Sequence, residues 1–310
     1  MSICLTLSNK VSDDSWKTNI PLIDGFGTEG IGSMMQYHLL LEFYADFLEV
    51  DFTYPGSTNF SHHSYSGYSE NEYLDLIDTF FNFPNLKNQW DEVYNVTEIN
   101  QELFSLIENN KDNNKKVLVN LSNCHRQIES ICNQNLKNVF TEERIDKIRT
   151  KLIFNGEKYF DDGVNISLHL RTTNPNDIPS EIVSPLREYY AKETGFYRYK
   201  NLINYLNKNI GSQKATLHIH SQGFTTKFEE FLEFKTNDFD VQLHIDDHPV
   251  SDLYHMSNAD LLIMSNSSFS WVASLLNKNQ KIVRDNFTNG SFIHNFLKAD
   301  YNFEKIYETH

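Results

Sequence analysis

The sequence predicts an α/β protein with two doubly wound domains, and three observations support this fold class. At 310 residues, the chain exceeds the usual size of a single hydrophobic core. Short apolar runs alternate with amphipathic helical patterns, as in parallel sheets covered by helices. The alternation restarts in the second half, with a boundary near 159–164. We therefore expect two Rossmann-like domains, residues 1–160 and 161–310, with a cleft between them.

The composition indicates a globular, acidic protein. Hydrophobic residues make up 39% of the chain, and the formal net charge is −15. Such a balance argues against binding to nucleic acid or to an anionic membrane, because both need a basic surface. The three cysteines, Cys4, Cys124 and Cys132, leave one unpaired in any disulfide scheme and favour a reducing compartment. Since neither a signal peptide nor a membrane-spanning run is recognisable, we expect a cytoplasmic protein without a membrane span.

The first half predicts strands and helices in alternation. Weak alternation at 2–7 predicts an opening strand, and Ser69 with Glu72 forms a capping box ahead of a helix. The remaining predicted elements are a helix from Ser33 through Phe47, a strand at 49–52, a helix at 98–109, a strand at 116–122, and helices at 128–140 and 142–153.

A glycine-rich loop precedes the first long helix. Gly25, Gly27 and Gly30 spell G-x-G-x-x-G, and Asp51 follows about twenty residues later, as in dinucleotide-binding folds. The preceding strand pattern is interrupted by Pro21, which disfavours a central strand. One interpretation is therefore an NAD-dependent oxidoreductase. The other is a loop that needs glycine only for its backbone angles.

The second half repeats the alternating pattern. Its predicted strands cover 165–171, 214–220, 241–245, 259–264 and 281–284, the last of which closes the sheet. Its predicted helices cover 185–209 and 227–234, another follows Ser268, and the final twenty residues are expected to pack back as a helix or tail.

Polar residues follow four of these strands. Ligands of such sheets bind beyond the carboxyl ends of the strands, so these side chains should meet at one crevice. They are Arg171 and Thr172, His220 and Ser221, Asp246 and Asp247, and Ser265 to Ser268.

Two of these strand ends suit a diphosphate. Alternation places His169 and Arg171 on one face of their strand, where a guanidinium can hold phosphate oxygens in a bidentate manner. The Ser/Asn turn at 265–268 opens a helix, whose free N–H groups and dipole also favour an anion. The alternatives are a structural ion pair for Arg171 and an ordinary N-cap for the turn.

The strings HLR at His169–Arg171 and SNSSFSW at Ser265–Trp271 resemble the donor half of the fucosyltransferase superfamily, which includes α1,2-, α1,6- and protein O-fucosyltransferases. The resemblance implies an inverting, metal-independent GT-B enzyme that uses GDP-fucose and a glycan acceptor. It implies that Arg171 is catalytic and holds the diphosphate, while His169 and Asp252 contact guanine and ribose. It also implies that Ser267, Ser268 and Phe269 wrap the phosphates, and we add Asn266 and Ser221 as donor-binding candidates because they follow strand ends.

The glycine-rich loop also resembles its counterpart in the first domain of this family. TEGIGS is similar to a loop that carries a catalytic glutamate in some protein O-fucosyltransferases, so Glu29 is the candidate base, flanked by Gly27 and Gly30. The chain departs from the family at Thr172 and Asn174, where a second Arg and an Asp are usual. It also has Ser221, Gln222 and Gly223 where relatives often carry acidic residues.

Two metal-dependent interpretations stay open beside this one. A metal could be bound by residues on neighbouring strands, namely His218, His220, His244, Asp246 and His248. The D-x-D string at Asp238–Asp240 could hold a metal with a UDP-sugar, or could be a solvated turn. We expect no metal and no cofactor other than the donor. A non-catalytic glycan-binding protein is the remaining alternative.

Overall fold

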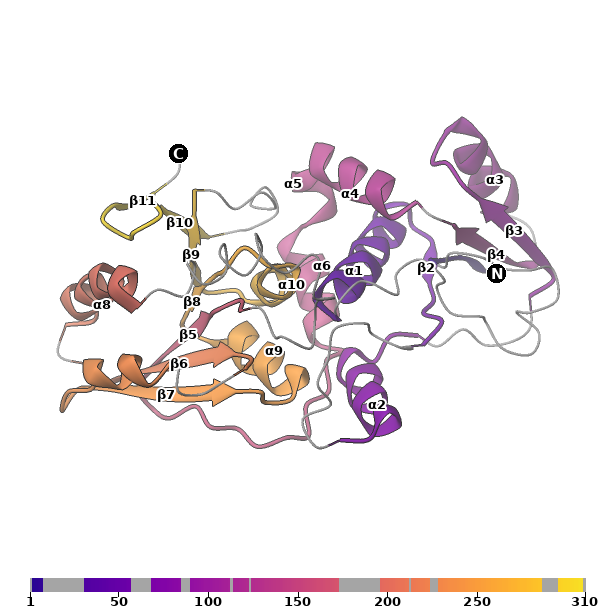
Figure 1. Ribbon diagram of the computed structural model, residues 1–310. Coiled ribbons are helices and arrows are strands. Elements are labelled where there is room, and N and C mark those ends of the chain that lie inside the picture. The colour runs from indigo at the N-terminus through magenta and orange to yellow at the C-terminus, as the bar shows by residue number, and fades with distance from the viewer. Residues whose placement is uncertain are drawn as a thin grey trace, which may run out of the picture. The chain divides into compact units, whose positions relative to one another are not determined.

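The computed structural model describes residues 2–7, 31–56, 68–84, 90–111, 114–122, 124–172, 196–211, 213–223, 228–285 and 295–308. The chain divides into two compact units (Figure 1). The first comprises Met1–Ser61 and Glu70–Ile153, and the second comprises His62–Ser69 and Phe154–His310. Each unit combines a parallel sheet with helices, which confirms the predicted α/β class.

The first unit contains a four-stranded sheet in the order β2-β1-β4-β3, with all neighbours parallel. Its helix α1 is buried on nearly all sides, and Leu39, Leu40 and Phe43 are fully buried in the core. The elements are β1 (Ser2–Thr6), α1 (Ile31–Phe47), β2 (Asp51–Phe52), α2 (Glu70–Phe81), β3 (Glu92–Val96), α3 (Gln101–Lys111), β4 (Lys116–Leu121), α4 (His125–Gln134), α5 (Leu136–Val139) and α6 (Glu142–Arg149).

The second unit contains a seven-stranded sheet in the order β11-β10-β9-β8-β5-β6-β7. All neighbours from β10 to β7 are parallel, and only β11 is antiparallel. The elements are β5 (Val164–His169), α8 (Phe196–Ile210), β6 (Ala215–Ser221), η3 (Glu229–Phe234), β7 (Phe239–Ile245), α9 (Pro249–Asn258), β8 (Leu261–Ile263), α10 (Ser268–Leu276), β9 (Gln280–Arg284), β10 (Phe296–Ala299) and β11 (Ile306–Glu308).

The strand order of the second unit is that of a Rossmann fold. From β5 the chain moves outward through β6 to β7, and it then returns to the other side of β5 to form β8, β9 and β10. The parallel strands therefore follow the dinucleotide-fold order 3-2-1-4-5-6, and the order reverses between β5 and β8. Ligands of such sheets bind at this switch point, beyond the carboxyl ends of the strands.

The two faces of this sheet differ in chemistry although both are buried. Ile166, Leu168 and Leu170 belong to an apolar core that includes Leu202 of α8 and Phe231 of η3. The alternating partners in β5 and β6 are polar and almost without solvent contact, and they are Asn165, Ser167, His169, Thr216, His218 and His220. Because buried polar groups need hydrogen-bond partners, this polar face must be satisfied by the elements that cover it.

The structure differs from the sequence prediction in several places, and one of them is helix α9, which was not predicted. The final residues form strands β10 and β11, so the predicted C-terminal helix or tail was wrong. These two strands extend the sheet beyond β9, so the strand predicted at 281–284 is not the last strand of the sheet. Leu297 and Ala299 are buried in alternation, which is the pattern of a strand. Strand β3 was not predicted, and the helix predicted at 227–234 is a 3-10 helix at Glu229–Phe234.

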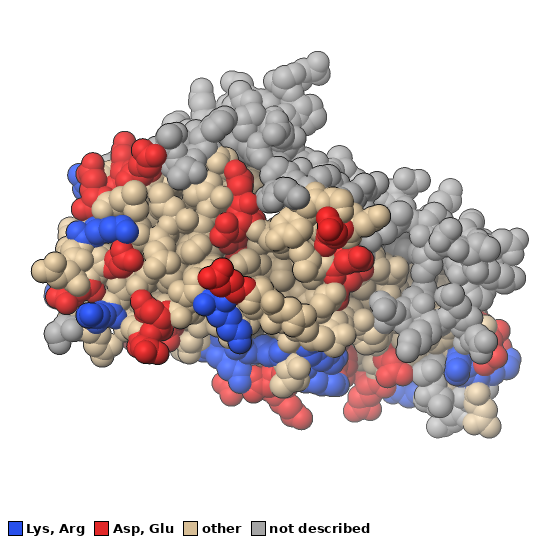
Figure 2. Space-filling view, turned by 90° about the horizontal axis from the view of Figure 1, so that it is seen from below, with Lys and Arg blue, Asp and Glu red and all other residues tan. Residues whose placement is uncertain are grey.

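Charged side chains of both signs are interspersed on the face that Figure 2 shows. In the first unit, Asp46 contacts both Arg144 and Lys147, and Glu42 contacts Lys151. These five residues are among those that line a cavity of about 190 Å³ between the end of α1, the start of β2 and α6. Among the helices that the structure describes, none is long and apolar enough to cross a membrane.

Candidate functional site

The candidate site lies at the switch point of the second sheet. Strands β5 and β8 are parallel neighbours, with Leu168 opposite Ile263, so their carboxyl ends lie side by side. Arg171 follows β5, and the segment 265–269 connects β8 to α10. The structure therefore brings together the two strand ends that the sequence marked as suited to a diphosphate.

The start of α10 is a capped helix terminus. Ser267 has extended backbone angles and its Oγ accepts a hydrogen bond from the Phe269 N–H at 3.2 Å. The Ser267 carbonyl accepts from the Trp271 N–H at 3.0 Å, which is the first bond of the helix. Residues 266–269 are all half-buried. The N-cap predicted as the alternative is thus present, and it is compatible with an anion site because a helix start leaves further N–H groups for a ligand.

His169 joins β5 to this helix start. Its Nδ1 lies 2.5 Å from the Oγ of Ser270 and 2.8 Å from the Oγ of Ser265. The Phe269 ring lies against the imidazole, with ring centroids 5.3 Å apart. Burial, with a smaller contribution from the charge of Arg171, lowers the pKa of His169 to about 3. The imidazole is therefore neutral at physiological pH and carries a single N–H.

Arg171 is the cation of this site. Arg171 is half-buried and lies two residues after His169, the last residue of β5. Its positive charge contributes to the lowered pKa of His169. A guanidinium is always charged and presents a planar fork of donors that matches phosphate oxygens. Arg171 can therefore bind an anionic group placed at the switch point.

Thr172 and Ser221 fasten the strand ends to one another. The Ser221 Oγ donates to the Leu170 carbonyl at 2.7 Å, and the Thr172 Oγ1 donates to the Gln222 carbonyl at 2.6 Å. The Gly223 N–H donates to the Asp246 Oδ1 at 2.9 Å. Four of the residues by which the sequence departs from the fucosyltransferase pattern, Thr172, Ser221, Gln222 and Gly223, thus link β5, β6 and β7 just beyond their ends.

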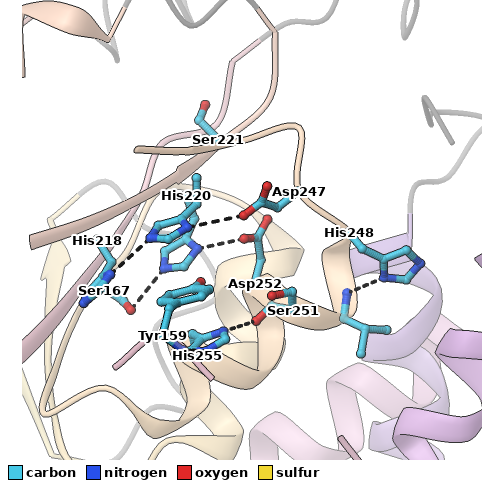
Figure 3. Close-up of polar contacts among 12 residues, drawn as sticks. Tyr159, Ser167, His218, His220, Ser221, Asp247, His248, Ser251, Asp252 and His255 are labelled. Carbon is cyan, nitrogen blue, oxygen red and sulfur yellow. Dashed lines mark hydrogen bonds and ion pairs between the residues drawn. The ribbon is translucent and has the colours of Figure 1, made fainter. Parts of the chain in front are cut away.

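Asp252 takes part in a buried chain with His220 and Ser167 (Figure 3). The Asp252 Oδ1 lies 2.8 Å from His220 Nδ1, and His220 Nε2 lies 3.2 Å from Ser167 Oγ. This connectivity resembles a serine hydrolase triad. Ser167 and His220 are completely buried, however, so no substrate can reach the hydroxyl. These hydrogen bonds instead connect α9 to the polar face of the sheet.

Burial also determines the ionisation of this chain. It raises the pKa of Asp252 well above its usual value, to which the neighbouring Asp247 adds, and it lowers the pKa of His220 well below its usual value. Asp252 is 7% exposed. Asp252 was predicted to contact the ribose or the guanine. In the structure, one oxygen of its carboxyl group is hydrogen-bonded to His220.

A second chain of hydrogen bonds runs across the same face from Asn165 through the buried His218 to the half-buried His244. His218 Nε2 lies 3.2 Å from Asn165 Oδ1, and its Nδ1 lies 3.1 Å from His244 Nε2. Tyr159 is sandwiched between His244 and His255, with ring centroids 4.0 and 3.4 Å away. Together the rings fill the space between the sheet and α9.

Three of the histidines considered as metal ligands make hydrogen bonds within the second unit. His218 and His244 contact each other directly, and His248 caps α9 by accepting from the Val250 N–H at 3.1 Å. No group of three ligating residues is gathered within the described ranges. Asp240 of the D-x-D string lies in β7 and pairs with Lys235 at 2.9 Å, so it is part of a strand and not of a turn.

Several predicted residues lie outside the described part of the chain. They are Gly25, Gly27, Glu29 and Gly30 of the glycine-rich loop, and Asn174. Conversely, sequence reasoning missed Ser270, Tyr159 and His255. Ser270 belongs to the SNSSFSW string and could have been found there, whereas nothing local marks Tyr159 as the partner of histidines that lie 85 to 96 residues later.

Comparisons with known proteins give a structural likeness only. A scan against protein-family models gives no match, and a search of curated proteins gives none either. Among solved structures, a mutant of Arabidopsis thaliana FUT1 in complex with GDP gives a match at 8% identity and a TM-score of 0.44. The match covers 90% of this chain and 69% of the FUT1 chain.

POFUT1 in complex with GDP-fucose gives similar matches in two crystal forms. One covers 90% of this chain and 94% of POFUT1 at 10% identity, with a TM-score of 0.41. The other covers 90% of this chain and 95% of POFUT1 at 11% identity, with a TM-score of 0.42. All three TM-scores lie below 0.5.

Proposed function

We propose that the chain is an inverting glycosyltransferase that moves a sugar, L-fucose from GDP-fucose, to a hydroxyl group of a glycan. The observation that carries the proposal is the placement of Arg171 and the start of α10 on adjacent strand ends at the switch point. The residues concerned are those by which the sequence resembles fucosyltransferases.

The leaving group of such a transfer is a nucleoside diphosphate. Negative charge develops on its oxygens as the sugar departs, and donors placed there in advance lower the barrier. Arg171 supplies a permanent cation, and α10 supplies backbone N–H groups and the positive end of its dipole. The second unit therefore supplies stabilisation of the leaving group.

The acceptor hydroxyl needs a base on the opposite side of the sugar, because an inverting transfer is a single displacement. We propose Glu29 of the first unit for this role. Its loop precedes a helix, and a helix start favours the ionised form of a carboxylate. On this proposal, the first unit handles the acceptor and the second unit handles the donor.

A ligand screen by thermal shift tests the donor assignment. A ligand present at a hundred times its dissociation constant adds about 2.7 kcal/mol to stability, which is readily measured. We expect GDP to stabilise the chain without added metal, Arg171→Ala to abolish this shift, and Lys305→Ala to keep it. Lys305 directly precedes β11 and is exposed, so its substitution controls for the loss of one positive charge.

The other nucleotides in the screen distinguish the alternatives. Stabilisation by NAD or NADP but not by GDP would indicate an oxidoreductase. A response to UDP that requires manganese would indicate a metal-dependent transferase. A chain that responds to none of the four nucleotides, but is stabilised by glycans, would be a non-catalytic glycan-binding protein. Each of these results contradicts the proposal.

A further inference from the structure

Two serine hydroxyls surround one nitrogen of His169. Ser270 Oγ and Ser265 Oγ lie 2.5 and 2.8 Å from Nδ1, and 3.2 Å from each other. Ser270 Oγ also accepts a hydrogen bond from the Ser265 backbone N–H at 3.3 Å. All three residues are at least nine-tenths buried. At such a buried site, each hydrogen must find an acceptor, so the possible arrangements can be compared.

If Nδ1 accepts, every donor in this group is satisfied. Ser270 donates its hydroxyl proton to Nδ1, and the Ser265 N–H and hydroxyl both donate to the two lone pairs of Ser270 Oγ. If Nδ1 instead carried the proton and donated it to Ser270, both lone pairs of Ser270 would be filled. The Ser270 hydroxyl would then donate to Ser265, and the Ser265 hydroxyl would be left without an acceptor in this group.

We infer that Ser270 and Ser265 position His169 as the Nε2–H tautomer, so that the ligand atom that meets this ring is a hydrogen-bond acceptor. The neutral imidazole has one proton, and an accepting Nδ1 leaves it on Nε2. Among the residues that the structure describes, Nε2 of His169 has no hydrogen bond. The inference rests on the proposed function and deepens it, since phosphate and nucleobase carbonyl oxygens are such acceptors.

The same contacts couple the two sides of the site. His169 ends β5, Ser265 follows β8, and Ser270 lies in the first turn of α10. The hydrogen bond from Ser270 to Nδ1, with Ser265 bound to Ser270 Oγ, therefore fixes the imidazole relative to the helix start that is proposed to bind phosphate. Ser265 and Ser270 act through His169 and are positioning residues.

The tautomer can be measured directly. The full chain is labelled with 15N-histidine, and the signals of His169 are assigned by their loss in His169→Asn. We expect the 15N shifts to show a protonated Nε2 and an accepting Nδ1 in the wild type. Ser270→Ala should keep the Nε2–H form through the Ser265 hydroxyl, whereas the double variant Ser265→Ala/Ser270→Ala, which removes both hydroxyl groups near Nδ1, should produce a mixture of tautomers. Ser265→Ala should keep the Nε2–H form, because the donor from Ser270 remains.

Affinity for GDP is measured on the same proteins by calorimetry. We expect Ser270→Ala to weaken GDP binding about tenfold, which corresponds to about 1.4 kcal/mol, and Ser270→Thr, which retains the hydroxyl, to restore most of it. Ser274→Ala is the matched control. It removes another buried hydroxyl of α10, which donates to the Trp271 carbonyl at 2.7 Å, and it should bind GDP as the wild type does.

The outcomes separate this inference from the proposed function. A proton on Nδ1 in the wild type, or equal GDP affinities for Ser270→Ala and Ser274→Ala, would overturn the positioning role even if GDP binds well. A wild type that binds no GDP would overturn the proposed donor. In that case the tautomer measurement still decides whether the two serines orient His169. If Ser270→Ala does not fold, the wild-type tautomer and Ser265→Ala give the same decision.

Discussion

Arg171 and His169 lie two positions apart at the end of β5, yet they contribute opposite electrostatic properties. His169 is buried and neutral, and two serine hydroxyl oxygens lie within 2.8 Å of its Nδ1. Arg171 is half-buried and supplies a planar guanidinium. A neutral donor of fixed orientation and a permanent cation together suit an anionic ligand that must be both oriented and stabilised.

Glu29 is the residue on which the acceptor half of the proposal depends. Glu29→Gln keeps the size and polarity of the side chain but removes its basicity. We expect transfer to an acceptor to fall by at least about a hundredfold, in the range typical of general-base loss, with GDP affinity unchanged. Kinetics with GDP-fucose and calorimetry with GDP measure the two quantities separately. Unimpaired transfer would remove Glu29 from the mechanism and leave the donor half standing.

At the scale of elements, α10 combines a structural cap with a proposed binding site. Its N-cap, Ser267, satisfies the Phe269 N–H, and its buried side includes Trp271 and Leu275. A cap stabilises a helix whether or not a ligand is bound, so stability and binding at this terminus have to be measured independently.

Two substitutions at Ser267 separate the cap from the ligand. Ser267→Ala removes the capping hydroxyl and should lower the free energy of unfolding by about 1 kcal/mol. Ser267→Asp supplies another good N-cap, so stability should be retained, but its negative charge should repel a diphosphate and weaken GDP binding by at least about tenfold. Urea unfolding and calorimetry check the two expectations. If the Asp variant bound GDP as tightly as the wild type, the phosphates would not lie at this helix start.

For the molecule as a whole, the buried histidines make stability depend on pH. Burial lowers the pKa of His169 and His218 to about 3 and that of His255 to about 4, and His220 is shifted in the same direction. These groups stay neutral in the folded second unit, while in the unfolded chain they are protonated below about pH 6.5. The unfolded state therefore binds more protons as the pH falls, and stability must decrease.

We expect the second unit to lose about 1.4 kcal/mol of stability per pH unit for each such histidine between about pH 6 and pH 4. The raised pKa of Asp252 has the opposite effect on stability, because the folded state takes up this proton at a higher pH than the unfolded state does. The four histidines outweigh this single carboxyl group. Urea unfolding at pH 7, 6 and 5 measures the trend. His218→Gln should reduce the slope by about one proton. An unfolding midpoint that does not move between pH 7 and pH 5 would contradict the expectation.

The sequence by itself determined the local structure of the second unit well. Its strands at β5, β6, β7 and β8 were predicted to within a few residues, because alternation and short apolar runs depend only on neighbours in the chain. Strand ends follow from the same pattern, so Arg171 and the Ser/Asn turn could be assigned to one edge of a parallel sheet. The edge strand β3, only partly buried, lacks that pattern and was missed.

Only the tertiary structure decided which polar residues meet. The pairing of Asp252 with His220, the sandwich of Tyr159 between His244 and His255, and the two serines on His169 all join distant parts of the chain. Sequence periodicity shows which face a residue occupies, but partners on that face depend on strand order and on how α9 and α10 cover it. The sequence thus located the candidate site, and the fold determined which of its residues are free to contact a ligand and which hold others in place.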